Sequence, residues 1–367
     1  MTMPISRRAL LWSLSLPLLV SGCATFDPRT VVTRRADPAH PLTRIALGSC
    51  LRENRAMPIW RPIAAAAPEL FIHLGDNIYG DTENMGEMRA KYGRLWSDPG
   101  YRALRRKVPV IATWDDHDYG KNNAGVEFEA KSASKQVFCD FFGEPAESER
   151  RRRKGGIYTS YLFGPPGKRL QVILLDTRYD RSPLVKVPRE QRAARKAQNM
   201  GYYRPDTDPS ARMLGEDQWR WLARELRIPA DLRLIASGTR VLAEETGHEQ
   251  WANFPAERQR LFDLIRETGA NGAVFVSGDP HFSEYSKLDG AGVPYPLWDM
   301  TSSALNQYNT GRRRNIRRVA GPYGEPNFGL IEIDWEQAVL QHTTRDLGGN
   351  TVLRQDIPLA TLRARTS

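Results

Sequence analysis

The amino-acid sequence predicts an α/β fold with a largely parallel sheet at its core. Short apolar stretches that suit buried strands alternate with segments whose apolar residues recur at three- and four-residue spacing, as on amphipathic helices. This alternation is typical of βαβ units. The predicted strands cover residues 43–50, 69–76, 108–115, 169–176, 232–239, 273–278 and 327–334. The predicted helices cover residues 83–96, 132–142, 215–226 and 256–268.

The last part of the chain has a different pattern. The stretches GLIEIDW, VLQHTTRD and TVLRQDI alternate apolar and polar residues. Such alternation suits antiparallel strands with one face in water, so we expect an antiparallel edge on the sheet. Residues 306–326, just before these stretches, are polar, basic and glycine-containing. We expect them to form a loop, either over the site or elsewhere on the surface.

The first residues are typical of a bacterial export signal. Two arginines precede an apolar run over residues 9–20, which is too short to span a bilayer. Small residues directly before Cys23 resemble a lipobox, in which the cysteine is lipidated. We therefore predict a signal peptide over residues 1–22 and a lipidated tether over residues 23–41. The protein would be exported and anchored in the cell envelope, facing the periplasm. The arginine pair also resembles a twin-arginine motif, and an ordinary signal peptide is the alternative.

Residues 42–367 are expected to form one domain, because no linker rich in serine and glycine interrupts them. The net charge of +10 suits anionic ligands or an anionic membrane surface. Nucleic-acid recognition would need basic residues interleaved with aromatic ones, or a known module, and the sequence contains neither. We infer no obligate protein partner.

Five predicted strands end in side chains that could bind a ligand. Loops at the carboxyl ends of strands converge on ligands in α/β sheets. The strand endings are RIALGSC, LFIHLGDNIYGD, VPVIATWDD, LQVILLDTR and AVFVSGDPH. Their convergence would bring cysteine, aspartate, tyrosine and histidine together from separate loops, which indicates a metal centre.

The stretch WDDHDYG, residues 114–120, is the densest polar cluster. Its acids and His117 could supply a ligand for a hard cation and a general acid, although acids that cap a turn are the alternative. Asp279 and His281 lie two residues apart, so their side chains point to the same side of an extended chain.

The composition of the candidate ligands favours two kinds of metal. Cys50 and Tyr79, which would each be structural alone, join His281 and shared carboxylates in a strongly anionic set. This set suits trivalent iron better than zinc. The neighbouring oxygen-rich set suits calcium, magnesium or manganese. Its members are Asp76, Asp115, Asp116 and either Asn122 or Asn123.

The remaining predictions for single residues are less specific. Cys50 and Cys139 could form a disulfide in an oxidising compartment, but the ligand-rich and aromatic surroundings favour two free thiols. Arg178 ends another strand, and its planar guanidinium suits phosphate, with a structural ion pair as the equal alternative. With Asn123 it is our candidate for contacting a substrate phosphate.

Taken in order, these motifs resemble those of PhoD-like alkaline phosphatases. The matching segments are GSC (48–50), HLGDNIY (73–79), TWDDHD (113–118), LDTR (175–178), GEDQW (215–219), SGDPH (277–281) and TSS (301–303). That family is a branch of the calcineurin-like metallophosphoesterases, so the resemblance implies an αββα sandwich of two mixed sheets flanked by helices. It also implies Fe³⁺ beside Ca²⁺, with Mn²⁺, Mg²⁺ or Zn²⁺ as substitutes.

The resemblance also implies roles for individual residues. Asp76 would bridge the metals, Cys50 and Tyr79 would bind iron, and Asp279 and His281 would complete the pair.

The same resemblance leaves open which of Asp115 and Asp116 coordinates. A metal-activated water would attack the phosphate ester at the two-metal centre, and His117 would protonate the leaving oxygen.

The implied activity is hydrolysis of phosphomonoesters, phosphodiesters or both. Longer PhoD proteins carry an extra N-terminal β domain, whereas here the strand that ends in Cys50 follows soon after Cys23. We therefore expect different access to the site. Two alternatives are a catalytically silent envelope lipoprotein that binds metal and polyanions, and a cell-wall glycan hydrolase. The second would leave Cys50, Tyr79 and His281 without roles.

Overall fold

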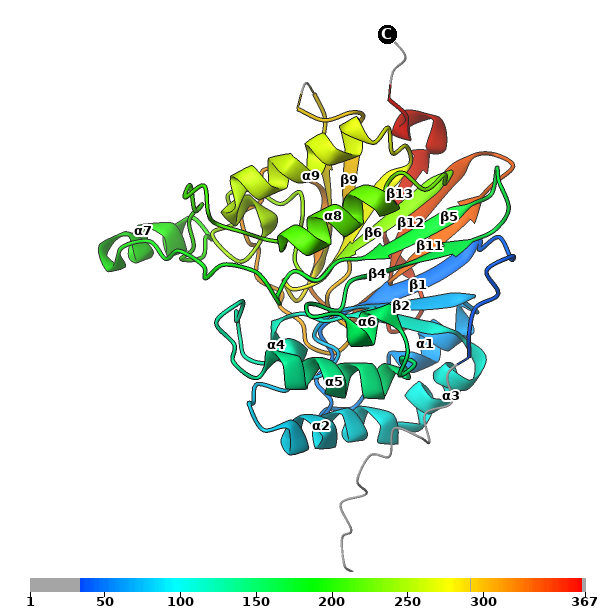
Figure 1. The fold of residues 1–367 in the computed structure, drawn as a ribbon, viewed down its shortest axis with the longest axis horizontal. Helices are drawn as coiled ribbons and strands as arrows, with labels where there is room; N and C mark the ends of the chain where they lie inside the picture. Colours follow the sequence, from blue (N-terminus) through cyan, green and yellow to red (C-terminus); the bar gives the residue numbers. More distant parts are fainter. Residues whose placement is uncertain (1–33, 291, 365–367) are drawn as a thin grey trace, which may run out of the picture.

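The computed structural model describes residues 34–290 and 292–364, in which two β-sheets lie face to face between layers of helices (Figure 1). The predicted signal peptide, Cys23 and residues 23–33 of the predicted tether lie outside the described residues. Within the described ranges, no helix is both long enough and apolar enough to cross a membrane. The αββα sandwich implied by the family resemblance is confirmed.

The first sheet has the strand order β13-β12-β11-β1-β2-β3. Its first three strands along the chain are parallel to one another, whereas the last three are antiparallel and extend the sheet beside β1. The predicted antiparallel edge is therefore confirmed. The strands are β1 (Arg44–Gly48), β2 (Leu70–Leu74), β3 (Val110–Thr113), β11 (Asn327–Asp334), β12 (Val339–Asp346) and β13 (Thr351–Pro358).

The second sheet has the strand order β10-β8-β9-β7-β6-β5-β4. The pairs β5–β6, β6–β7 and β7–β9 are parallel, and antiparallel strands complete both edges. The strands are β4 (Thr159–Phe163), β5 (Leu170–Leu174), β6 (Leu232–Ser237), β7 (Ala273–Ser277), β8 (Ser283–Leu288), β9 (Leu297–Thr301) and β10 (Arg318–Tyr323). The sequence did not predict β8, β9 or β10, because the first two carry buried acids, Glu284 and Asp299, that hide an apolar pattern.

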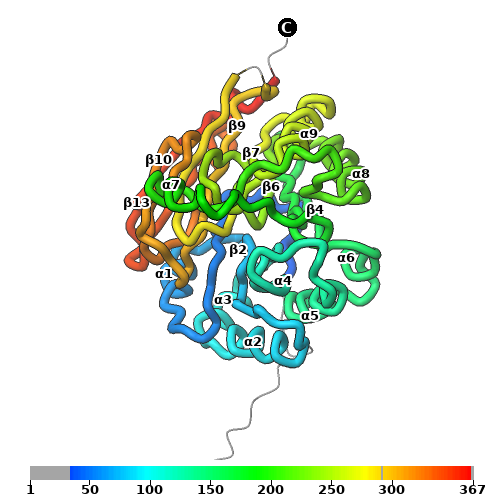
Figure 2. The backbone as a smooth tube through the Cα atoms, turned by 90° about the vertical axis from the view of Figure 1, so that its left-hand side faces the viewer, coloured from blue at the N-terminus to red at the C-terminus, as the bar shows by residue number. Residues whose placement is uncertain are grey.

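Helices cover the outer face of each sheet (Figures 1 and 2). One apolar cluster fills the space between the sheets and continues under α8 and α9, and a second lies between the first sheet and α1, α2, α3 and α5. The helices are α1 (Trp60–Ala65), α2 (Met85–Ser97), α3 (Pro99–Lys107), α4 (Asp116–Tyr119), α5 (Lys131–Phe142), α6 (Glu149–Arg152), α7 (Arg192–Ala197), α8 (Glu216–Glu225) and α9 (Pro255–Glu267).

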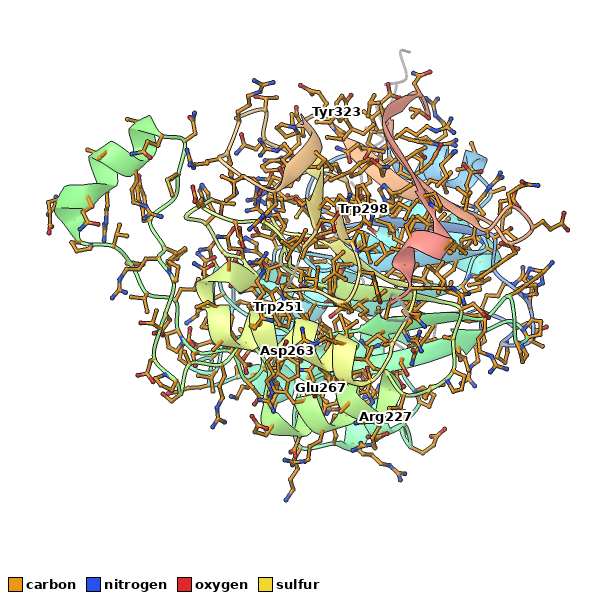
Figure 3. All side chains as sticks on the ribbon, turned by 90° about the horizontal axis from the view of Figure 1, so that it is seen from above. Arg227, Trp251, Asp263, Glu267, Trp298 and Tyr323 are labelled. Carbon is orange, nitrogen blue, oxygen red and sulfur yellow. The ribbon has the colours of Figure 1, made fainter. Side chains whose placement is uncertain are left out.

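Local sequence signals fix several helix ends. The Asn84 side chain accepts hydrogen bonds from two backbone N–H groups at the start of α2, and the Asp98 side chain accepts one from Tyr101 at the start of α3. Helix α5 ends at Gly143, whose φ of 69° suits glycine. Helix α7 carries no buried residue and stands out from the body of the protein in two perpendicular views (Figures 1 and 3).

The strand ends of the two sheets approach one another very closely. A Cβ atom on Gly278, after β7, would lie 2.6 Å from the carbonyl oxygen of Leu74 and 2.8 Å from Ser49 Oγ. A Cβ atom on Gly75, where φ is +100°, would lie 2.5 Å from Cβ of Asp115. Glycine is needed at both positions, because only a missing side chain lets the loops after β1, β2, β3 and β7 meet.

Candidate metal centre

Asp76 belongs to two adjoining groups of potential metal ligands. One ligand atom from each of Cys50, Asp76 and His281 lies within 4.8 Å of the others, and the same holds for Asp76, Asp116 and His117. These residues follow β1, β2, β3 and β7, so they come from both sheets. A carboxylate shared by two ligand groups has the arrangement needed to bridge two cations.

The backbone at this site is held in an unfavourable conformation. Non-glycine residues with positive φ cost roughly 1–3 kcal/mol each and persist where the surrounding structure enforces them. Here the N–H of Asp76 donates to Asp118 Oδ1 at 3.1 Å, and the N–H of His281 donates to Ser303 Oγ at 2.9 Å. The candidate ligands with positive φ are Cys50 (62°), Asp76 (50°), Asp279 (86°) and His281 (65°).

A thiol and a phenol lie on one side of Asp76. Cys50 Sγ is 3.5 Å from Asp76 Oδ2, and the Tyr79 hydroxyl is 2.9 Å from His281 Nε2. Burial raises the pKa values of Cys50 and Tyr79 well above their usual range, and the charge of Asp76 raises both further. A bound cation would reverse this effect and hold both groups in their anionic forms. Cys50 and the distant Cys139 are free thiols, as predicted.

Asp116 lies on the other side of Asp76. Its Oδ2 accepts a hydrogen bond of 2.6 Å from the backbone N–H of Asn123. Burial alone would raise the pKa of Asp116, but the charges of His117 and Arg178 hold it below its usual value. Asp116 is therefore an ionised carboxylate beside Asp76, as a hard cation requires.

His117 is fixed by two neighbours. Its Nδ1 lies 2.7 Å from Asp81 Oδ1, and its ring lies over the ring of Tyr79 with 4.1 Å between centroids. Burial lowers the pKa of His117, but the charges of Asp116, Asp76 and Asp81 outweigh burial and raise it to about 10. His117 is thus a cationic group at the edge of the centre.

Asp115 and Arg178 lie behind the centre and pair with each other. Arg178 is fully buried, and its Nε donates to Asp115 Oδ1 at 2.6 Å while its Nη1 donates to Glu249 at 2.7 Å. Full burial and these two carboxylates favour a structural ion pair over contact of Arg178 with a substrate phosphate. The alternative, a structural ion pair, is what the structure contains. Asp115 is in neither ligand group, so Asp116 is the acid placed to coordinate.

Two other predicted residues lie beside the ligand groups. Asp279 Oδ2 is buried and has no hydrogen-bond partner within the described residues. Burial raises the pKa of Asp279 to about 6, although Arg240 and Arg313 oppose the shift. Asn123 is partly exposed and donates from its side chain to the Tyr203 hydroxyl at 3.0 Å.

The sequence indicated that Asp81 faces the same crevice as Asp76 and that Asp118 belongs to the polar cluster after β3, but it assigned neither acid a supporting role. Asp118 Oδ1 accepts from the backbone N–H groups of Asp76 and Asp115, so one carboxylate ties the ends of β2 and β3 together. Asp81 is the last residue of the stretch LFIHLGDNIYGD, and Asp118 lies in the stretch WDDHDYG. Asp81 contacts His117, 36 residues away, and Asp118 accepts from Asp76, 42 residues away, and no local pattern indicates these two contacts.

The donors present fit metal cations. A thiol, a phenol, two imidazoles and buried carboxylates converge, and the unpartnered Asp279 Oδ2 needs a positive partner because a buried carboxylate without one is costly. A set that includes a thiol and a phenol and a set rich in carboxylate oxygen lie on opposite sides of the shared Asp76, which suits two unlike cations.

Comparisons with known proteins agree with this fold. A family model described as PhoD-like phosphatase matches residues 45–325. Alkaline phosphatase D of Bacillus subtilis (strain 168) is 24% identical over 290 residues, which cover 68% of this chain and 47% of that protein. The chain thus spans about half the length of that curated relative.

Two solved structures share the fold. A structure of PhoD has a TM-score of 0.68 and 17% identity, covering 90% of this chain and 73% of that one. GAP50, the anchor in the inner membrane complex of Plasmodium, has a TM-score of 0.50 and 11% identity, covering 88% and 89%. The family model covers most of the chain, including every strand end that forms the centre, and the chain therefore belongs to the PhoD-like phosphatase family.

Proposed function

We propose that the protein is a metal-dependent phosphoric ester hydrolase that acts on phosphomonoesters, phosphodiesters or both. The observation that carries this proposal is the pair of ligand groups that share Asp76. Family membership supports it, because the matched family is described as a phosphatase family. No serine-hydrolase or nucleotide-binding motif in the sequence offers a competing mechanism.

The residues on the two sides of Asp76 would hold different metals. Cys50, Tyr79 and His281 would hold Fe³⁺ together with Asp76, because thiolate and phenolate are strong anionic donors. Asp116 and Asp279 would hold Ca²⁺ with the same bridging carboxylate, and Mn²⁺, Mg²⁺ or Zn²⁺ are chemically acceptable substitutes. When bound, such a pair of cations neutralises the phosphate oxygens and lowers the pKa of the attacking water.

The chain itself would manage the proton of the leaving group. Asp81 engages Nδ1 of His117, which leaves Nε2 as the nitrogen that can donate a proton. Contact with the Tyr79 ring fixes the plane of the imidazole. His117 is therefore our candidate general acid, and Asp81 is a positioning residue that acts through it.

Elemental analysis of the purified protein tests the proposal, with hydrolysis of p-nitrophenyl phosphate and bis-p-nitrophenyl phosphate measured in parallel. We expect iron near one per chain and calcium-stimulated cleavage, and Asp76→Asn should lose both metal and activity. Asp208→Asn, an exposed acid outside the centre, is the matched control. Protein that stays inactive after iron and calcium are restored would contradict the proposal and favour the catalytically silent polyanion-binding lipoprotein.

We also propose that the protein is exported and anchored in the envelope through a lipid on Cys23. The support is the arrangement of arginines, apolar run and cysteine in the first 23 residues. Cys23→Ser should move the protein from the membrane fraction to the soluble periplasmic fraction and abolish labelling by radioactive palmitate. Membrane association and a mature N-terminus that are both unchanged in the variant would contradict anchoring at this residue.

A further inference from the structure

A cavity of about 550 Å³ lies beside the candidate metal centre, and its wall contains five cationic side chains but no carboxylate. The cations come from two segments that are far apart in the sequence. Three lie on the arm that carries α7, which stands out from the body (Figures 1 and 3), and two lie in the loop between β9 and β10. They are Lys186, Arg192, Lys196, Arg312 and Arg313.

None of these five side chains forms an ion pair or donates a hydrogen bond within residues 34–290 and 292–364. Two arginines that follow Arg313 in the chain behave differently. Arg314 pairs with Glu245 at 2.6 Å, and Arg317 pairs with Glu244 at 2.6 Å. Carboxylates thus neutralise these two arginines but not Arg312 and Arg313 of the cavity. Gathering like charges costs energy, so the cavity is suited to an anion supplied from outside the chain.

Arg192 adds a second observation. Its Nε is buried without a hydrogen-bond partner, and its guanidinium lies over the Tyr202 ring at 5.6 Å. Stacking on an aromatic ring holds a guanidinium in one orientation, which suits it for binding phosphate through several donors.

The cavity shares its wall with the candidate metal centre. Asn123 lines the cavity, and its backbone N–H donates to Asp116 Oδ2 at 2.6 Å. Arg313 also lines it, and its charge acts on Asp279 and His281. The cavity is therefore placed to receive the remainder of a molecule whose reacting phosphate is held at the centre.

We propose that this cavity is a subsite for a second anionic group of the substrate, so that the preferred substrates are phosphate esters with at least one further phosphate. The inference rests on the proposed phosphoester hydrolysis and adds the substrate class. Ammonium and guanidinium groups supply charge-assisted hydrogen bonds to phosphate, which are the strong kind. The subsite selects substrates by charge and not by the identity of the alcohol.

A matched pair of chromogenic substrates tests the subsite. Thymidine 5′-(p-nitrophenyl phosphate) and its 3′-phosphorylated form release the same p-nitrophenolate and differ by one phosphate. We expect kcat/KM to be about tenfold higher for the 3′-phosphorylated substrate, and the ratio to fall as sodium chloride is raised because salt screens exposed charges. Equal kcat/KM values at low salt would overturn the proposal.

Variants of the cavity test whether its cations cause the difference in kcat/KM between the two substrates. The combined substitution Lys186→Gln, Lys196→Gln and Arg312→Gln should bring the ratio of the two kcat/KM values close to one. The control Arg314→Gln removes a neighbouring cation that is already paired with Glu245, and it should keep the ratio of the unchanged protein. A ratio that survives the triple substitution would also overturn the proposal.

Calorimetry separates failure of the subsite from failure of the proposed function. If neither substrate is cleaved, the proposed hydrolysis fails, and the binding of thymidine 3′,5′-bisphosphate decides about the cavity alone. Binding that the triple substitution weakens about tenfold would support an anion site. Absence of binding to the unchanged protein would reject it.

Discussion

Nδ1 of His117 and Oδ1 of Asp81 lie 2.7 Å apart, although the two residues follow different strands of the first sheet. Asp81 itself has a positive φ of 46°, a conformation that turns its carboxylate toward the imidazole. The pair fixes the orientation of the His117 ring and leaves its Nε2 available to donate a proton. This relationship makes Asp81 the residue through which the role of His117 can be tested without altering a candidate metal ligand.

Asp81→Asn should lower kcat roughly tenfold, because general acid catalysis contributes about 10²–10⁴-fold and only the orientation of the acid is disturbed. Metal content should not change, and KM should change little. The matched control is Glu83→Gln, which removes an exposed carboxylate of the same loop that pairs with Lys121. If the variant loses iron or calcium, His117 is a ligand and not the proton donor.

Tyr79→Phe should remove a visible absorption band from the iron-loaded protein, because a phenolate bound to Fe³⁺ absorbs by charge transfer. The hydroxyl lies 2.9 Å from His281 Nε2, within reach of the same cation. Tyr308→Phe, which alters an exposed tyrosine, should leave the spectrum unchanged. A spectrum that is identical in the protein and in Tyr79→Phe would show that the phenol does not bind iron.

Arg178→Gln should destabilise the fold by about 3–5 kcal/mol, because it leaves the carboxylates of Asp115 and Glu249 buried without their cation. Chemical denaturation measures the loss, and Arg220→Gln, an exposed arginine paired with Asp217, should cost less than about 1 kcal/mol. A variant of unchanged stability with a raised KM would instead place Arg178 in contact with substrate.

The sequence indicated four of the residues that form the two ligand groups. Cys50, Asp76, Asp116 and His281 each follow an apolar stretch, and parallel strands bring such ends to one edge. The division of these strands between two sheets could not be deduced from local patterns, because β1 pairs with β11 across most of the chain. Only the family resemblance supplied that part of the architecture.

Buried charge explains the main gaps in the prediction. Arg178 follows a strand just as the ligands do, but its partner Glu249 lies 71 residues away in the chain. Glu284 and Asp299 interrupt the apolar pattern of β8 and β9 because each has buried partners, Arg240 for the first and two backbone N–H groups for the second. Such long-range pairs decide whether a polar side chain is catalytic or structural, and spacing along the sequence does not encode them.

His342 should make the fold sensitive to acid. This residue of β12 lies between the two sheets, where its ring meets the Tyr285 ring edge-on at 4.9 Å, and neither ring nitrogen has a hydrogen-bond partner within the described residues. Burial lowers the pKa of His342 from 6.5 to about 3. At a pH between these two pKa values, the unfolded chain binds more protons than the folded protein. Stability is therefore lost as the pH falls below about 6.5.

His342→Leu should remove this part of the acid sensitivity, which amounts to at most about 1.4 kcal/mol per pH unit. Acidification from pH 6.5 to 4.5 lowers the unfolding free energy of the unchanged protein. In the variant this loss should be smaller, by up to about 2.7 kcal/mol. Urea denaturation at both pH values measures the difference. Gln341→Leu introduces the same side chain on the same strand without removing an ionisable group, so its loss on acidification should match that of the unchanged protein. Equal losses in all three proteins would show that His342 does not couple protonation to unfolding.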